Sequence, residues 1–302
     1  VELKEKALFV LSQSGSPRAR EILVSVAKGQ QHPELAMKAI EYLGLEGSDD
    51  AGRDLQDIYS ASTSQAVKAK ALEGLMLGDH DEAVLEAAKG EADPKLRGKA
   101  VEMLGIMDAR EELAELYRTE SEFEVKAKIL EGLFIADDAA TLAELARSEP
   151  NPDLRRKAIE GLGLVDSQES RQVLESLYES ETDTTTRAKI LEAFFLMDDA
   201  ETLGRVAREE QDPELRAKAI EGLGLVSTRE SGETLKALYS SETDRGIKVS
   251  ILQAFMLQEN AEALIEIVRS EEDRELRKQA LQYLSFIDSD EAMDFLLTAL
   301  ED

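Results

Sequence analysis

ELRAKAIEGLGLV, at Glu214–Val226, is the stretch on which the whole chain is patterned. Close copies of it are PELAMKAIEYLGLE from Pro33, PKLRGKAVEMLGIM from Pro94 and PDLRRKAIEGLGLV from Pro152. With the first apolar residue of each copy as its anchor, the ten anchors are Leu3, Leu35, Val67, Leu96, Val125, Leu154, Thr186, Leu215, Ile247 and Leu276. The anchors are 29 or 32 residues apart. A fixed period in this range is typical of solenoid proteins.

Each copy predicts a pair of amphipathic helices. In the quoted copy Leu215, Ile220 and Leu223 fall on one stripe of a helix. Capping residues that favour a helix start stand before prolines, at Asp93, Asn151 and Asp212. A short loop leads to the second helix, and Ser227 with Glu230 predicts a capping box for one of these. The sequence therefore predicts an all-α solenoid of about ten two-helix layers.

The aromatic residues follow a longer period of two copies. Tyrosine occupies one second-helix position in alternate copies, at Tyr59, Tyr117, Tyr178 and Tyr239. The copies between them carry a small residue there, at Ala88, Ala146, Ala207 and Val268. The first helices of these intervening copies carry a large residue, at Phe134, Phe194 and Phe255. Large side chains that face small ones interdigitate, so we expect buried aromatic residues and a packing unit of two repeats.

Two ladders of basic residues accompany the repeat. The residue after the anchor is basic in most copies, and we expect it to pair with the loop acids Asp93, Asp183, Asp212, Asp244 and Asp273. Two residues later a lysine recurs, at Lys38, Lys70, Lys99, Lys128, Lys157, Lys189 and Lys218. A glutamate follows each of these lysines three residues on. We interpret this second ladder as a neutralised helix face and not as a groove for anions.

The charge balance narrows the range of partners. The chain has 36 Lys and Arg against 64 Asp and Glu, which gives a net charge of −28. The electrostatic field of a chain with this charge repels nucleic acid and anionic membranes and attracts basic proteins. We therefore expect a protein or peptide partner, basic ones included, and we expect neither nucleic-acid binding nor insertion into a membrane.

No linker or low-complexity segment interrupts the copies, so we expect residues 1–302 to form a single solenoid domain. The chain begins at Val1, directly within the first copy, and we expect it to be excised from a longer protein. It contains no cysteine, which excludes disulfides and fits either a reducing or an oxidising compartment. The sequence therefore indicates neither a localisation nor an oligomeric state.

The motifs of the common enzyme classes are missing. The two histidines, His32 and His80, have no metal-ligand partner at helical spacing, and we interpret His80 as a residue of a capping loop. No phosphate-binding, dinucleotide-binding or nucleophile-elbow motif is present. Acid pairs such as Asp137 and Asp138 precede second helices, where they interact favourably with the helix dipole. We therefore expect no enzyme activity, no cofactor and no metal.

The repeated pattern D-P-x-L-R-x-K-A-[IV]-E-x-L-G, clearest from Asp212 to Gly224, resembles HEAT repeats along the entire chain. More narrowly, it is similar to the short units of bacterial HEAT-repeat proteins and of phycobilin-lyase-type HEAT domains. The resemblance implies a right-handed α-solenoid with first helices outside, second helices on the concave side, and protein binding as the default role. Deoxyhypusine hydroxylases need paired His-Glu motifs, which this chain lacks. HEAT-like DNA glycosylases need basic, aromatic surfaces, and the net charge of −28 argues against such a surface here.

We therefore predict a non-enzymatic scaffold that binds a protein or peptide on its concave face. The residues expected to line that face point outward from the second helices and are Glu111, Glu115, Arg118, Glu144, Arg147, Glu201, Arg205, Arg208, Glu262, Glu266 and Arg269. Their mixed signs suit a polar protein surface. Two alternatives stay open: a rigid spacer in a larger bacterial protein, and a chromophore-binding enzyme similar to the phycobilin lyases.

Overall fold

A computed structural model describes residues 2–29 and 32–301 of the chain, with side chains as far as Thr298. The described residues form twenty α-helices and no strand: α1 (Glu2–Ser12), α2 (Pro17–Ala27), α3 (Pro33–Glu46), α4 (Asp49–Ala61), α5 (Gln65–Leu77), α6 (Asp81–Gly90), α7 (Pro94–Ile106), α8 (Arg110–Thr119), α9 (Phe123–Ile135), α10 (Ala139–Ser148), α11 (Pro152–Val165), α12 (Gln168–Ser180), α13 (Thr184–Leu196), α14 (Ala200–Glu209), α15 (Pro213–Val226), α16 (Arg229–Ser241), α17 (Arg245–Leu257), α18 (Ala261–Ser270), α19 (Arg274–Leu284) and α20 (Asp290–Glu301). The predicted all-α solenoid of ten two-helix layers is confirmed.

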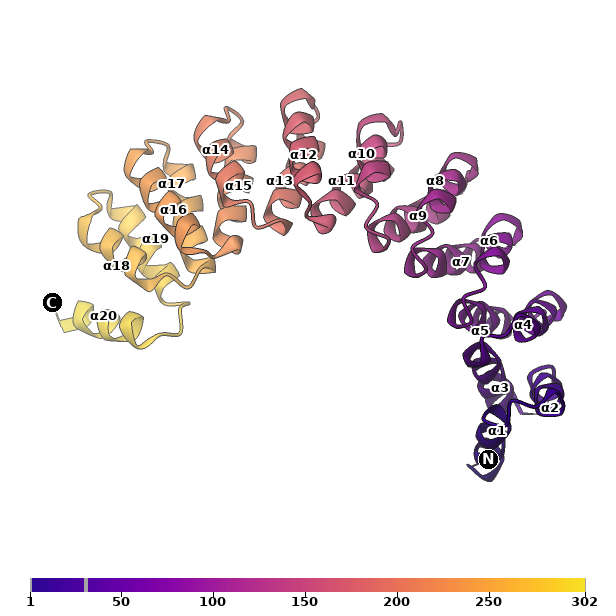
Figure 1. Cartoon of the computed structure of the whole chain (residues 1–302). Coiled ribbons are helices and arrows are strands. Elements are labelled where there is room, and N and C mark those ends of the chain that lie inside the picture. Colours follow the sequence, from indigo (N-terminus) through magenta and orange to yellow (C-terminus); the bar gives the residue numbers. More distant parts are fainter. Residues whose placement is uncertain (1, 30–31, 302) are drawn as a thin grey trace. The chain divides into compact units, whose positions relative to one another are not determined.

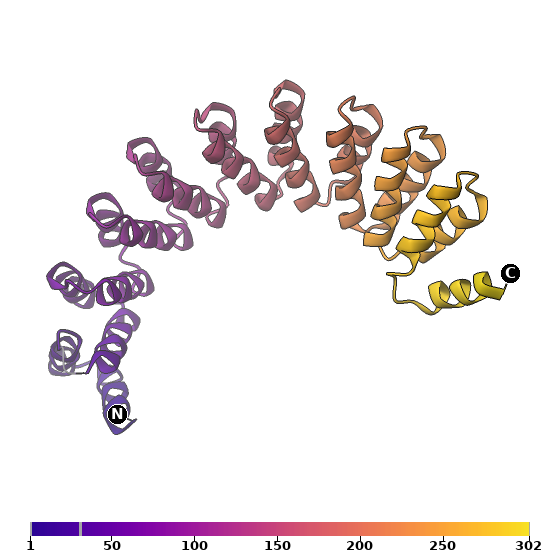
Figure 2. The same cartoon turned by 180° about the vertical axis from the view of Figure 1, so that it is seen from behind.

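The internal packing divides the chain into two units, Val1–Gly161 and Leu162–Asp302. In each unit the first helices of the layers, which carry odd numbers, stack on one another in one row. The second helices, which carry even numbers, form another row beside it (Figures 1 and 2). Because the two units are described separately, the single continuous domain stays a prediction.

In the first unit the odd-numbered helices approach one another at glycines. A Cβ atom added to Gly44 of α3 would lie 2.6 Å from the Cα atom of Gly74 in α5. A Cβ atom added to Gly105 of α7 would lie 2.8 Å from the Cα atom of Gly132 in α9. Real Cβ atoms do not come so close to backbone, so these two pairs of helices depend on glycine for their packing.

The second unit repeats this arrangement with an alanine on one side. A Cβ atom added to Gly163 of α11 would lie 2.8 Å from the Cα atom of Ala193 in α13. The same distance separates a Cβ atom on Gly224 of α15 from the Cα atom of Ala254 in α17. Close contacts thus join the first helices two by two, which agrees with the predicted packing unit of two repeats.

The even-numbered helices are spread further apart than the odd-numbered ones in both units. In the first unit the odd-numbered helices accordingly lie on the inner side of the bend (Figure 1). The prediction that second helices line the concave side is therefore wrong for this unit. The cause is the position of the small residues, which lie near the ends of the first helices and draw that row together.

Acidic residues, and not the glycines of the GLGL segments, end most of the first helices. Among the described residues other than glycine, those with left-handed backbone have φ between 44° and 61° and are Asp79, Asp108, Asp137, Asp166, Asp198, Ser227 and Glu259, while Gly47 ends α3 in the same conformation. Asp138 and Asp199 then cap the second helices by accepting the backbone N–H groups of Thr141 and Thr202. The predicted capping box at Ser227 is wrong by one residue, because Thr228 is the N-cap and pairs with Ser231.

The glycine contacts give a test within one helix. We expect Gly105→Ala to lower the free energy of unfolding by about 1–3 kcal/mol, because the new methyl group would meet the backbone of Gly132. Gly98 is the matched control in α7, since its Cβ atom would lie 3.4 Å from the flexible Lys128 side chain. Gly98→Ala should be neutral or stabilising by up to about 1 kcal/mol. Equal effects of the two changes in urea unfolding would contradict the proposed close approach.

Candidate functional site

A buried polar cluster joins three helices of two successive layers in the first unit. The Tyr117 hydroxyl, from α8, donates a hydrogen bond of 2.7 Å to Glu149, which follows α10. Lys126 Nζ, from α9, lies 3.8 Å from the same carboxylate and 4.3 Å from the centre of the Tyr117 ring. The backbone N–H of Asn151 donates to the carboxylate as well, at 2.9 Å. The Glu149 carboxylate is thus surrounded by donors and held rigidly.

The same cluster occurs three more times, at Tyr59–Glu91–Lys68 in the first unit and at Tyr178–Glu210–Arg187 and Tyr239–Glu271–Lys248 in the second. Tyr117, Tyr178 and Tyr239 are buried and Tyr59 is half-buried, which confirms the predicted core role of the tyrosines. The predicted partners are wrong for Lys68, Arg97, Lys126, Arg187, Arg216 and Lys248. They pair with glutamates that follow the second helices, while loop acids such as Asp93, Asp212 and Asp244 accept backbone N–H groups and cap first helices.

The four glutamates of these clusters are held in their charged form. Burial by itself would raise the pKa of Glu91, but the hydrogen bonds from Lys68, Tyr59 and the Asp93 backbone outweigh it and lower the pKa to about 2. The pKa of Glu271 is likewise about 2, because donation by Tyr239, the Asp273 backbone and Lys248 outweighs its burial. Carboxylates this acidic cannot take up a proton near neutral pH, so the clusters hold layers together and do not suit acid–base chemistry.

The lysine ladder lies on the odd-numbered helices and is fully occupied within the protein. Lys70 Nζ lies 3.0 Å from Glu73 of its own helix, α5, and 3.6 Å from Glu41 of α3, the first helix of the preceding layer. In the second unit Lys218 Nζ lies 3.2 Å both from Glu221 and from Glu192. These ion pairs, within one helix and between successive first helices, confirm the predicted neutralised face. The contacts between layers could not be seen from the sequence spacing alone.

The eleven residues expected to bind a partner lie on the even-numbered helices, as predicted. Ten of them are exposed and Arg205 is half-buried. The first unit carries Glu111, Glu115, Arg118, Glu144 and Arg147, and the second carries Glu201, Arg205, Arg208, Glu262, Glu266 and Arg269. Within the described residues, the five of the first unit form no ion pair. In the second unit, Lys236 lies 3.7 Å from Glu266, and the Arg269 guanidinium lies over the ring of Phe295 at 5.2 Å.

Sequence reasoning missed a row of exposed apolar residues. Each is the residue ten positions after an anchor, at the end of a first helix. We call these residues the apolar row: Leu45, Leu77, Ile106 and Ile135 in the first unit, and Leu164, Leu196, Leu225, Leu257 and Phe286 in the second. The signal was present in the sequence as a ladder with the period of the repeat, and it was hidden because these residues adjoin the buried stripe along the chain.

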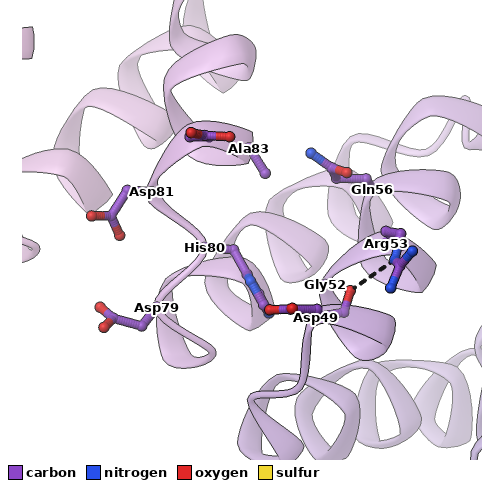
Figure 3. A pocket seen from close by; sticks show the side chains of 9 residues that line it. Asp49, Gly52, Arg53, Gln56, Asp79, His80, Asp81 and Ala83 are labelled. Carbon is purple, nitrogen blue, oxygen red and sulfur yellow. Dashed lines mark hydrogen bonds between the residues drawn. The ribbon is translucent and has the colours of Figure 1, made fainter.

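His80 lies in a cleft of about 550 Å³ between α4 and α6 (Figure 3). As predicted, it belongs to the loop before a second helix, and it occupies the N-cap position of α6 without a cap hydrogen bond from its side chain. Its ring packs on two glycines, since a Cβ atom on Gly52 would lie 2.5 Å from His80 Cε1 and one on Gly78 would lie 2.8 Å from Cδ2. Nε2 is buried and has no hydrogen-bond partner in the described part of the chain.

The first unit also contains an apolar hollow of about 520 Å³ between α2–α3 and α4–α5. Ala36, Met37, Ile58 and Val67 are among the residues that line it. Among its described lining residues Lys28 is the one ionisable group, so no carboxyl or imidazole faces this space. The hollow can hold an apolar group and offers no proton donor and acceptor pair for catalysis.

Across residues 2–29 and 32–301, no group of three or more His, Asp or Glu side chains is placed to hold a metal ion. None of the helices in the described ranges combines the length and the apolar character that a bilayer span requires.

Comparisons with known proteins agree with this geometry. Residues 139–203 match the sequence model of the family described as HEAT repeats. Kap95p in its complex with RanGDP is similar in fold, with a TM-score of 0.52 and 12% identity over 94% of this chain and 48% of that one. Kap95 in the Kap95:Nup1 complex gives a TM-score of 0.50 and 13% identity over 97% and 49%. The chain thus spans about half the length of these relatives. The molecule is an α-solenoid.

Residues 139–203 of the solenoid are thus similar to HEAT repeats, and the other described layers have the same two-helix arrangement. The CpcE–CpcF complex of phycocyanin lyase from Nostoc is 16% identical over 78% of this chain and 93% of that one. Its TM-score of 0.37 is too low to support the narrower resemblance to phycobilin lyases, which stays a prediction. A search of the curated proteins finds no match.

The acidic glutamates of the buried clusters predict how stability depends on pH. A carboxyl whose pKa is lower in the folded chain than in the unfolded chain stabilises the fold above its unfolded value, and this contribution is lost as the pH falls through the folded value. For Glu91 and Glu271 the window runs from about pH 4.5 down to about 2. We expect Glu91→Gln with Glu271→Gln to be less stable at pH 7 and to lose less stability than the parent between pH 5 and 3.

Glu86 and Glu272 are exposed and serve as the matched control pair. Their replacement by Gln should leave the loss between pH 5 and 3 unchanged. The measurement is urea unfolding followed by circular dichroism at both pH values. If the Glu91 and Glu271 variant loses as much stability as the parent, the buried clusters do not hold their carboxylates charged as described.

Proposed function

We propose that the chain is a non-enzymatic scaffold that binds a protein or peptide along the outward positions of its second helices. The observation that carries this proposal is the contrast between the two helix rows. Lysines on the first helices are paired with glutamates of the protein itself. The second-helix residues expected to bind a partner in the first unit form no such pairs among the described residues, so they are available to a partner; they are Glu111, Glu115, Arg118, Glu144 and Arg147.

The chemistry of this surface suits a protein. Each layer that contributes to this surface carries both glutamate and arginine. Such a mixture of charges fits a polar protein surface better than a uniform polyanion. The net charge of −28 favours partners with basic segments and disfavours nucleic acid. Two solved structures of similar fold are complexes of Kap95p with RanGDP and of Kap95 with Nup1, which are proteins. In the first unit the surface lies on the outer side of the bend, so the proposal attaches to the second helices and no longer to the concave face.

The test is affinity capture with the purified chain at low and at high salt, followed by mass spectrometry. We expect a protein that is released by salt, because the contacts are exposed charges. Glu111→Gln with Glu115→Gln and Glu144→Gln should reduce its capture several-fold. Glu34, Glu122 and Glu124 are exposed glutamates elsewhere in the first unit, and the same change at these three should have little effect.

Two results would count against the proposal. One is capture of nucleic acid alone. The other is a captured protein that binds the Glu111, Glu115 and Glu144 variant as well as it binds the parent, since the second-helix charges would then be irrelevant to recognition.

A chromophore-binding enzyme is the second candidate, and the apolar hollow beside Met37 and Ile58 is the observation that favours it. The absence of carboxyl and imidazole groups from its described lining argues for a bound apolar group and against catalysis there. A purified chain with visible absorbance, lost in Ile58→Asp, would support this alternative.

A further inference from the structure

The apolar row is a separate surface, because it lies on the first helices and shares no residue with the second-helix charges. Its members are 37–65% exposed. Burial in the solenoid core therefore does not explain their apolar character. The row recurs at the same position of the repeat in every layer from the second to the tenth, so in each unit it follows successive layers and is not a scatter of single apolar residues.

Helix geometry places the row beside the neutralised lysine ladder. Leu77 follows Glu73 by one turn of α5, and Ile106 follows Glu102 by one turn of α7. Residues four apart lie on the same helix face. The row therefore has the ladder glutamates on its N-terminal side, and in the first unit it belongs to the helices on the inner side of the bend.

The other side of the row is acidic as well. Asp79, Asp108 and Asp137 follow Leu77, Ile106 and Ile135 by two residues and end the same helices with left-handed backbone. All three aspartates are exposed. Asp108 accepts a hydrogen bond from Arg110 at 2.7 Å, while Asp79 and Asp137 have no ion pair among the described residues. The apolar strip thus has lysine-paired glutamates along one edge and aspartates, two of them without an ion pair, along the other.

A partner that covers this strip needs apolar groups in the centre and positive charge at the border that carries Asp79 and Asp137. An amphipathic helix rich in Lys and Arg has that distribution, whereas an acidic or uncharged helix would leave Asp79 and Asp137 unpaired. With neighbouring layers roughly 8–10 Å apart, the four members of the first unit extend over about 24–30 Å. A helix of about 16–20 residues covers that length.

We propose that in the first unit Leu45, Leu77, Ile106 and Ile135 form a docking strip for a basic amphipathic helix of another protein. The apolar face of that helix packs on the four side chains, and its Lys and Arg residues pair with Asp79 and Asp137. The second unit carries the same strip from Leu164 to Leu257, so the chain presents two such strips.

The probe is a labelled synthetic peptide of about 18 residues with leucine on one helix face and lysine on the other. Its affinity is measured by fluorescence anisotropy at about 0.15 M salt, where exposed charges are partly screened. We expect it to bind at least about tenfold more tightly than a scrambled peptide of equal composition, and more tightly than a peptide with glutamate in place of lysine.

Two sets of variants locate the site. Leu77→Ser with Ile106→Ser and Ile135→Ser should weaken binding about tenfold or more, and because the three residues are exposed the melting temperature should change little. If this variant folds poorly, Asp79→Asn with Asp137→Asn gives the same test, since Asn tolerates left-handed backbone. The variant of Glu111, Glu115 and Glu144 should bind the peptide like the parent, which separates this strip from the second-helix surface.

Three results would overturn the proposal. Equal binding of the scrambled peptide would show attraction by net charge alone. Unchanged affinity in the serine variant would place the peptide elsewhere. A dimer of the parent chain in analytical ultracentrifugation that dissociates in the serine variant would show that a second copy of this chain covers the strip.

Discussion

A layer of two helices cannot bury its apolar stripe by itself, and every layer of this chain relies on its neighbours for that burial. The layers meet in twos, at glycine and small residues between the first helices and at a cluster in which a second-helix tyrosine and a first-helix lysine or arginine hold the glutamate that follows the next second helix. Because the first helices touch through backbone and the second helices through long side chains, the first-helix row is drawn together. This difference in contacts determines which row of helices lies inside the bend of the first unit, and therefore which surface a layer presents on each side.

Most of this fold could be predicted from the sequence. The period of the anchors predicted the layers, the apolar spacing predicted the helices, and the alternation of Tyr117 with Ala146 predicted the packing in twos. The glycine contacts explain why the curvature could not be predicted in the same way. Nothing in the spacing of Gly105 and Gly132 indicates that these two residues meet, because contacts between layers depend on how the helices are rotated against each other.

The candidate surfaces were predictable in part. The exposed second-helix charges were found from helical periodicity, and that face is exposed in the structure. The basic partners of Glu149 and Glu210 were assigned to the loop aspartates, because the sequence does not show that the chain after each second helix turns its glutamate inward. The apolar row from Leu45 to Phe286 was overlooked because an exposed leucine and a buried one look alike in sequence. Its residues recur with the period of the repeat and are exposed in the structure, so together they form a surface.

The pairing of layers is the central claim, and deletion of layers tests it most directly. Removal of residues 94–151 takes out both layers of one pair and leaves Tyr59, Glu91 and Lys68 together. Removal of residues 94–122 takes out one layer and leaves Glu149 and Lys126 without Tyr117. Urea unfolding of the two shortened chains should give a midpoint close to the parent for the first deletion and a clearly lower one for the second. Equal midpoints for the two deletions would contradict the account.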